Sequence, residues 1–348
     1  MTPVGRGRAV AAGVGAGLLL LAVVVAASAV GTVDLPLGTT ARVLASAVLP
    51  GAAAEVEGWH RAVILDVRLP RVLLAAMAGG GLGLAGAVMQ GLFRNPMADP
   101  AVVGVSGGSA LGAVSALYLV PPAADLFAVP VAAFAGGLGC ALVVYALATS
   151  RGRTEVLTLL LAGIAVGSIA NALTSFVLSL AVADWEVGKQ MLVWIMGSLE
   201  GRTWQHVAMA APLVLGGSLW LGVHTRELNA LLTGEESALA VGVDVPRVKR
   251  DLLVLAALVT AATVAVMGIV AFVGLMVPHM VRLVVGPDHR RVLPLSFLTG
   301  AIFLVLADLL TRTAPTAELR LGVVTALAGG PFFLYLLLRH RRALQGAA

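Results

Sequence analysis

Charged residues are scarce in this chain. Of its 348 residues, 12% are charged and 59% are hydrophobic. A soluble domain carries about 25% charged residues, so this chain has too little polar surface to cover a globule in water, and most of its exterior must face lipid. The scarcity of charge excludes soluble enzymes, secreted disulfide scaffolds and disordered regulators. It predicts an integral membrane protein.

Cysteine and lysine are also nearly absent. The single cysteine, Cys140, lies in an apolar run, so it has no partner for an internal disulfide and belongs to no thiolate cluster for a metal. Only two of the 23 basic residues are lysines, Lys189 and Lys249, and the arginines stand between apolar runs without interleaved aromatics. The net charge of +5 therefore indicates membrane topology and anionic lipid headgroups rather than nucleic acid.

Motifs for catalysis are missing. The six histidines are scattered, with no paired ligand spacing and no HExxH motif. There is no GxxxxGK[ST] phosphate loop, because the only Gly-Lys pair, Gly188 and Lys189, is followed by Gln190. We therefore expect no enzyme activity, no metal site and no cofactor in this chain.

Long apolar runs are what the chain has in abundance. At ~20 apolar residues per span, 59% of 348 residues would supply about ten helices. Ten runs are found, near 9–30, 72–92, 101–120, 126–148, 156–182, 204–223, 251–267, 269–285, 293–311 and 321–338. We predict an all-α, polytopic membrane protein with about ten transmembrane helices and both termini cytoplasmic, forming a single domain over residues 1–348.

The first run also resembles a signal peptide, since it follows Arg6 and Arg8 and ends in small residues. It is longer than the usual ~7 to 15-residue signal core, so we interpret it as a retained span.

In this topology the basic residues divide unequally between the cytoplasmic and the outer side of the membrane. Eight of the 23 lie outside, and the other 15 are cytoplasmic, which is the expected bias. The eight are Arg42, Arg61, Arg68, Arg71, Lys189, Arg202, Arg312 and Arg320. Basic residues on the outer side oppose the usual cytoplasmic enrichment. A cluster of them therefore requires either acidic residues of this chain as ion-pair partners or another protein that binds them.

Glycines recur at a spacing of four inside the runs, which is typical of tight helix contacts in membranes. The pairs are Gly79 and Gly83, Gly108 and Gly112, and Gly163 and Gly167.

The longest cytoplasmic hydrophilic stretch, 224–250, reads HTRELNALLTGEESALAVGVDVPRVKR. Thr233 and Gly234 precede two glutamates that favour a first helical turn, and Gly242 and Pro246 follow. The pattern predicts a short surface helix with a glycine stop. Such a helix buries little by itself, so we interpret it as a contact for another protein, with a passive loop as the alternative.

Six blocks of sequence resemble one family. The first is RLPRVLLAAMAGGGLGLAGAVMQGLFRNPMADPAVVGVSGGSALGAV, from Arg68 to Val114. The others are LLLAGIAVGSIANAL from Leu159, WIMGSLEGRTW from Trp194, TGEESALAVGV from Thr233, GIVAFVGLMVPHMVRLVVGPDHRRVLPLS from Gly268 and ELRLGVVTALAGGPFFLYLLL from Glu318. Together they resemble the FecCD permeases, the membrane subunits of ABC importers for ferric siderophores, haem and cobalamin.

The resemblance implies a ten-helix protomer in the bacterial inner membrane, paired as a homodimer with a translocation path along the dimer axis. It also implies two cytoplasmic ATPase subunits, which use ATP and Mg²⁺, and an extracytoplasmic solute-binding protein. The loop at about 226–247 would couple to the ATPase. The coupling positions carried over by this resemblance are Gly234, Glu235, Ala238 and Gly242.

The resemblance further implies that outward arginines meet acidic residues of the binding protein. Arg68 and Arg71 flank Pro70 at the start of the second span, on one helix face, and Arg312 ends the ninth run on the same side. The alternative is that these arginines are headgroup anchors or partners of Asp66 and Asp308.

The implied cargo is a large metal chelate, an iron siderophore or haem, moved by alternating access, and a cobalamin importer is the alternative. An ion-coupled secondary transporter or channel is a further alternative. It is disfavoured because Asp308 is nearly alone as an intramembrane ionisable residue and lies four residues before Arg312, which predicts an ion pair.

Two short motifs, around Pro278 and around Asn95, can each be interpreted as structural or as functional. Pro278 and His279 predict a kink between two half helices, with contact between His279 and a ligand as the less favoured reading. Arg94, Asn95 and Pro96 predict a tight cytoplasmic turn in which Asn95 caps backbone groups.

The purified chain alone should neither bind nor hydrolyse ATP, because no segment supplies the backbone cradle and lysine for phosphates. Hydrolysis should appear only after the cognate ATPase subunit is added, as measured by phosphate release. Robust turnover by the isolated chain would contradict the assignment.

Overall fold

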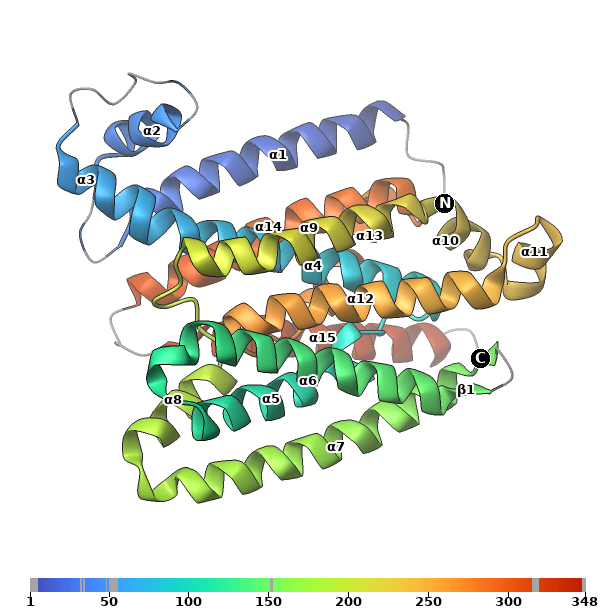
Figure 1. Ribbon diagram of the computed structural model, residues 1–348. Coiled ribbons are helices and arrows are strands. Elements are labelled where there is room, and N and C mark those ends of the chain that lie inside the picture. Colours follow the sequence, from blue (N-terminus) through green and yellow to red (C-terminus); the bar gives the residue numbers. More distant parts are fainter. Residues whose placement is uncertain are drawn as a thin grey trace.

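The computed structural model describes residues 6–345, apart from 32, 34, 48, 50–55, 151–152 and 315–318. Helices run side by side along the long axis of the molecule (Figure 1). Ten of them contain the apolar runs: α1 (Arg6–Ala29), α4 (Leu69–Leu92), α5 (Val105–Leu119), α6 (Asp125–Ala148), α7 (Val156–Leu180), α9 (Trp204–Val223), α12 (Val245–Met267), α13 (Val273–Val285), α14 (His289–Thr313) and α15 (Leu321–Gln345).

Shorter elements connect these helices. Four are α-helices: α2 (Leu37–Ser46), α3 (Gly58–Ala62), α10 (Thr225–Leu232) and α11 (Glu235–Ala240). A fifth, α8 (Trp185–Ile195), follows α7. The others are the π-helix η1 (Val63–Arg68), the 3-10 turns η2 (Pro100–Val103), η3 (Pro122–Ala124) and η4 (Ala181–Ala183), and a two-stranded ribbon of β1 (Thr149–Ser150) and β2 (Arg153–Thr154).

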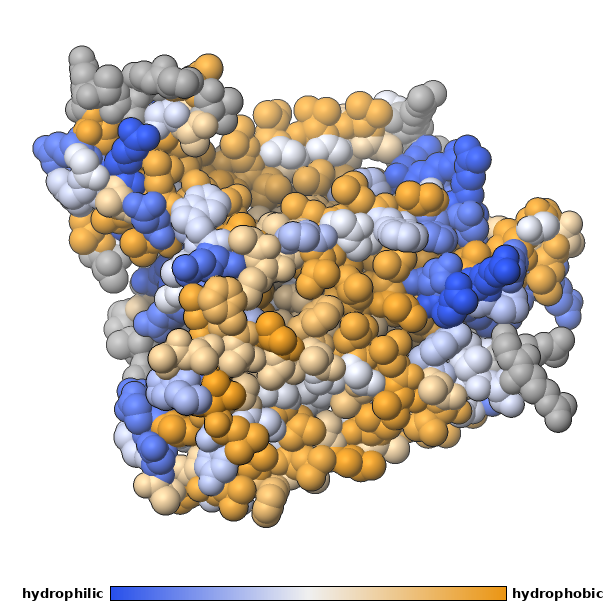
Figure 2. Space-filling model, in the orientation of Figure 1, coloured by the Kyte–Doolittle hydropathy of each residue, from blue (hydrophilic) through white to orange (hydrophobic). Residues whose placement is uncertain are grey.

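Eight helices in the described residues are long and apolar enough to cross a membrane. The two remaining apolar helices, α5 and α13, have 15 and 13 residues. At 1.5 Å per residue, both are shorter than the ~30 Å hydrocarbon core. An apolar band covers the middle of the molecule, and hydrophilic residues gather at its two ends (Figure 2). The chain is therefore a multi-pass membrane protein.

The two ends of the bundle carry different elements (Figure 1). The end named here the α10–α11 end also carries the start of α1, the ribbon and the end of α15. The end named here the α8 end carries α2, α3, α8 and the start of α9.

Helix α4 is the central element, and it packs against α1, α9, α12, α13 and α14. Three of its glycines allow backbone-to-backbone contact. A Cβ atom on Gly79 would overlap the carbonyl oxygen of Gly300, and one on Gly86 would overlap that of Gly274. A Cβ on Gly83 would lie 2.5 Å from the Ser296 carbonyl oxygen. The predicted tight contact at Gly79 and Gly83 is therefore confirmed.

A similar contact joins α5 to α6, where a Cβ on Gly108 or Gly112 would overlap the carbonyl oxygens of Gly136 or Ala132. Small residues let membrane helices approach closely enough to gain dispersion energy, which replaces the hydrophobic driving force of water.

The chain between α12 and α13 is irregular, at the gap between the apolar runs 251–267 and 269–285 that the sequence predicts. Gly268 and Phe272 have positive φ angles of 77° and 68°, whereas Pro278 lies inside α13. The break is buried against two other segments. Ser198 N donates to Met267 O at 2.8 Å, and Gly197 and Gly322 pack against the backbone of Gly268 and Ile269. Irregular backbone is tolerated at membrane depth when protein satisfies its polar groups in this way.

The turn after α4 matches its prediction. Arg94 has a φ of 48°, and Asn95 Oδ1 accepts a hydrogen bond from Met97 N at 2.9 Å. Asp99 follows in the same loop and caps η2 by accepting from Ala101 N. Burial raises the pKa of Asp99, and the hydrogen bond from Ala101 opposes this rise.

Candidate functional site

The segment at 224–250 forms two short helices, as its sequence predicts. Helix α11 begins at Glu235, directly after Gly234, whose φ is 120°. The chain leaves α11 through Gly242 at a φ of 85°, and Pro246 occupies the first turn of α12. Both glycines have backbone angles that L side chains rarely adopt, so they set the direction of the chain on each side of α11.

The face that α11 presents outward differs from the one expected. Ala238 is fully buried and belongs to the main hydrophobic core, so its small size serves packing within this chain. The apolar side chains that project from this segment are Leu239 and Val241, which are 55% and 73% exposed. Exposed apolar side chains beside a glycine turn form a surface suited to contact with another protein.

Glu235 fixes α11 to the membrane helices. Its Oε1 atom accepts a hydrogen bond from Lys249 Nζ at 2.5 Å, and Lys249 on α12 is only 7% exposed. This ion pair joins α11 to the second turn of α12.

Asn229 makes a second link, from α10 to the start of α14. Its Nδ2 donates to Asp288 Oδ1 at 2.7 Å, and its Oδ1 accepts from His289 N at 2.9 Å. His289 is fully buried, and its Nε2 faces Gly91 near the end of α4. Helix α10 is thus connected through two residues of α14 to the central helix α4.

Asp288 is ionised in this arrangement. Burial opposes ionisation, but the hydrogen bonds from Asn229 and from Arg290 N, together with the charges of Arg291 and Arg290, lower its pKa below the ordinary value. A carboxylate at the start of α14 is also favoured by the helix dipole.

A cluster of arginines lies at the α8 end. Arg71 forms a bidentate ion pair with Asp308. Its Nη2 lies 2.9 Å from Asp308 Oδ1, and its Nε lies 3.0 Å from Oδ1 and 3.1 Å from Oδ2. Arg312 Nε lies 3.2 Å from Asp308 Oδ2, which confirms the predicted ion pair four residues apart. Arg68 is 6% exposed and donates to the carbonyl oxygens of Ser28, Ala29 and Val33.

These contacts bear on the two explanations for the outward arginines. Pairing with Asp308, one of the alternatives, is observed for Arg71 and Arg312, whereas Asp66 forms no ion pair within the described part of the chain. Docking of a binding protein stays a prediction. The cluster is not sealed, because Arg68, Arg71, Arg312 and Arg320 line a depression of about 470 Å³ at this end.

His279 lies beside an aromatic ring, with its ring centroid 6.0 Å from that of Phe332 in an edge-on arrangement. Three residues after it, Arg282 donates to Gln90 Oε1 and, at 2.8 Å, to Ala87 O. These contacts place the end of α13 against α4.

Several of these residues were not singled out by sequence reasoning. Asn229 and His289 stand 60 positions apart, so no local pattern joins them. The local signal that could have marked this helix start is Asp288, a favourable N-cap residue before an apolar run. Leu239 and Val241 were visible as apolar residues in a hydrophilic stretch, but their outward direction depends on how α11 packs.

The bundle and its two polar ends define a class, the multi-pass helical membrane proteins. A family description narrows this class. The model of the FecCD transport family matches residues 14–339, and the chain belongs to that family.

Three relatives illustrate the similarity. A cobalamin import system permease protein of Halobacterium salinarum is 52% identical over 283 residues, covering 81% of this chain and 75% of the relative. A hemin transport system permease protein of Yersinia pestis is 41% identical, covering 83% and 86%. An Fe(3+) dicitrate transport system permease protein of Escherichia coli is 40% identical, covering 81% and 87%.

A solved structure, described as an inward-facing conformation of a metal-chelate type ABC transporter, has the same fold. Its TM-score is 0.82 at 29% identity, covering 94% of this chain and 98% of that one.

Replacing Asp308 by asparagine should destabilise the protein, because Arg71 and Arg312 would lose their shared carboxylate. Breaking a buried ion pair on one side costs about 3–5 kcal/mol, which a thermal unfolding scan in detergent would detect as a lower Tm. The control is Glu200→Gln, which removes the more exposed Arg320–Glu200 pair at the same end and should cost about 1 kcal/mol or less. Equal Tm values for the two variants would show that the Asp308 cluster is not a structural element.

Proposed function

We propose that this chain is the permease subunit of an ATP-driven importer that moves a large metal chelate across the cytoplasmic membrane by alternating access. The supporting observation is the surface segment α10–α11, which exposes Leu239 and Val241 and is tied through Asn229 to α14 and α4. The chain has no phosphate loop of its own, so ATP and Mg²⁺ would be used by two separate ATPase subunits.

The relatives carry names for cobalamin, hemin and Fe(3+) dicitrate. What these cargoes share is a metal held in a large organic ligand. We propose this class as the substrate, with ferric chelates and haem as one candidate and cobalamin as the second. The 52% identical relative favours the second candidate.

We propose that all ten apolar helices cross the membrane, including the short α5 and α13, and that the α10–α11 end is cytoplasmic. Helix α1 begins and α15 ends at this end (Figure 1). The basic residues there support the assignment, since cytoplasmic ends carry an excess of arginine and lysine. They include Arg226, Arg247, Lys249, Arg250, Arg290 and Arg291.

A second copy of the chain would complete the translocation path. Helix α7 is largely exposed in the single chain, and so is α15. Asn171 lies in the middle of α7 with an exposed side-chain amide that forms no hydrogen bond within the described residues. An amide facing lipid would be costly. We therefore propose that α7 faces a homodimer axis, where Asn171 would meet water, cargo or the partner.

The coupling proposal retains Gly234, Glu235 and Gly242 from the sequence expectation and replaces the outward role of Ala238 by Leu239 and Val241. The glycines would set the position of α11, and Glu235 would transmit its movement through Lys249 to α12. Movement of α11 would switch the dimer between outward-open and inward-open states.

Replacing Leu239 and Val241 together by glutamate should abolish chelate uptake and co-purification with the cognate ATPase, because two charges would be desolvated in the contact. Both side chains are exposed, so the Tm of the isolated chain should be unchanged. The matched control, Leu239→Met with Val241→Ile, should transport normally in reconstituted vesicles. Normal transport by the glutamate variant would remove α11 from the coupling interface.

The depression at the α8 end would receive an acidic segment of the solute-binding protein. Four arginines line it, Arg68, Arg71, Arg312 and Arg320, and such a basic surface attracts acidic side chains. Because Arg68, Arg71 and Arg312 also hold the fold, Arg320 is the position at which docking can be tested separately.

The variant Arg320→Glu should slow capture of the binding protein by about tenfold at low salt and flatten its dependence on ionic strength. Surface plasmon resonance over a salt series would measure both. The control is Arg42→Glu, an exposed arginine on α2 outside the depression. Identical association rates for the two variants would contradict docking at the arginine cluster.

A further inference from the structure

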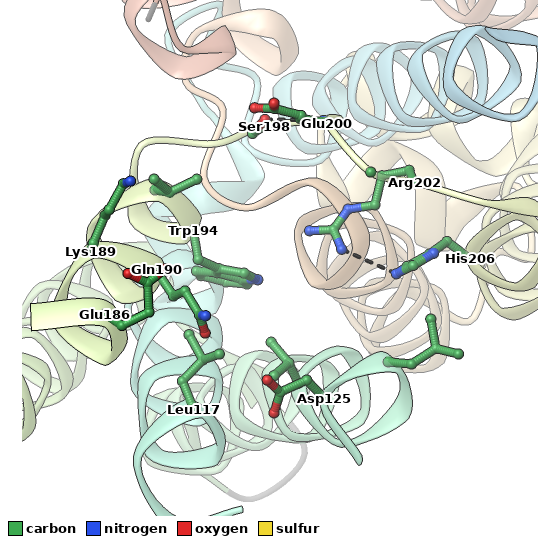
Figure 3. A pocket seen from close by; sticks show the side chains of 14 residues that line it. Leu117, Asp125, Glu186, Lys189, Gln190, Trp194, Ser198, Glu200, Arg202 and His206 are labelled. Atoms are coloured by element: carbon green, nitrogen blue, oxygen red, sulfur yellow. Dashed lines mark hydrogen bonds between the residues drawn. The ribbon is translucent and has the colours of Figure 1, made fainter. Parts of the chain in front are cut away.

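A cavity of about 520 Å³ lies at the α8 end, between the first turns of α6, helix α8, the loop after it and the start of α9. Its volume is typical of small-molecule sites, which span about 300–1,000 Å³. Figure 3 shows Trp194, Arg202 and Asp125, which come from three different segments and surround one space. The cavity is separate from the α10–α11 segment, and it shares Ser198 and Glu200 with the arginine-lined depression.

Three buried polar atoms at this cavity have no hydrogen-bond partner within the described part of the chain. They are the donors Trp194 Nε1 and Arg202 Nε and the acceptor Asp125 Oδ1. Trp194 is only 6% exposed, so bulk water does not solvate its ring nitrogen freely. Buried polar groups in proteins almost always have partners, whereas these two donors and one acceptor beside the cavity remain without a hydrogen bond among the described residues.

The Arg202 guanidinium has no carboxylate partner among the described residues. Its one side-chain contact joins Nη1 to His206 Nε2 at 3.1 Å. Burial lowers the pKa of Arg202 to about 10, so it still carries its charge at neutral pH. Further charged side chains line the cavity, namely Asp125, Glu186, Lys189 and Glu200. The cavity wall therefore carries charges of both signs, which favours a zwitterionic occupant over a simple anion. Phosphate matches a guanidinium especially well, because several N–H groups can donate to its oxygens.

Exposed aromatic side chains mark the depth of the cavity in the membrane. Tyr118 and Phe127 lie on the connection from α5 to α6, Trp185 starts α8, and Trp204 starts α9; their exposed fractions run from 43% to 78%. Aromatic rings of this kind gather at the level of lipid headgroups. The cavity wall also has apolar members, Leu117, Val129 and Val193. The occupant is therefore a molecule from the level of the membrane at which lipid headgroups join their acyl chains.

We propose that this cavity binds the headgroup of an ethanolamine phospholipid, with its phosphate at Trp194 and Arg202 and its ammonium at Asp125. A primary ammonium carries three N–H donors and can complete the hydrogen bonding of Asp125 Oδ1. A choline group has no donor, and a glycerol headgroup has no positive charge for the carboxylate. The proposal does not depend on what the protein transports.

The test is native mass spectrometry of the full chain in detergent, titrated separately with phosphatidylethanolamine, phosphatidylcholine and phosphatidylglycerol. The wild-type chain should retain phosphatidylethanolamine most strongly. Arg202→Gln should weaken it roughly tenfold or more, as expected for loss of a hydrogen bond between charged groups. Asp125→Asn should remove the preference for phosphatidylethanolamine over phosphatidylcholine while leaving binding of the phosphate intact.

The control is Arg61→Gln, an exposed cation at the same end that does not line the cavity, and it should bind as the wild type does. A thermal scan of each variant excludes loss of the fold as the cause. Equal retention of all three lipids by the wild type and the two cavity variants would overturn the proposal and leave water as the occupant. Binding of soluble glycerophosphoethanolamine without binding of the lipid would overturn the membrane source.

Discussion

The close approach of α4 to its neighbours is the contact on which the rest of the structure depends. Gly79, Gly83 and Gly86 leave room for the backbone oxygens of Gly300, Ser296 and Gly274. In a membrane, apolar side chains gain little by leaving lipid for protein, so close packing must provide the association energy. These glycines fix α13 and α14 against α4, and the contacts of Arg71 with Asp308 and of Arg282 with Gln90 depend on that geometry.

The consequence is a direct structural path between the ends. Near one end of the α4–α14 pair, Arg71 of α4 meets Asp308 of α14. Near the other, Gly91 of α4 meets His289 of α14, which Asn229 ties to α10. The arginine cluster and the α10–α11 segment therefore rest on the same two helices.

Much of this arrangement followed from local sequence. The ten apolar runs correspond to ten helices, and Glu235, Gly242 and Pro246 mark the ends of α11 and the start of α12 as predicted. The pair of Asp308 and Arg312 was also readable, because four residues make one turn of a helix. Each of these features depends on residues a few positions apart, whose mutual geometry is set by the helix itself.

Only the tertiary structure decided which faces look inward. Hydropathy cannot separate a buried alanine from a lipid-facing one, since both surroundings are apolar, and so Ala238 was expected on the outside of α11 but lies inside. The break at 268–272 was visible as a gap between two apolar runs, but its packing beside the loop at Ser198, which donates to Met267 O, was not. Arg71 pairs with Asp308, which is 237 positions away in the sequence. Sequence determined the helices and their local pairs; contacts between distant segments determined partners, exposure and the cavity, because these exist only once the helices pack.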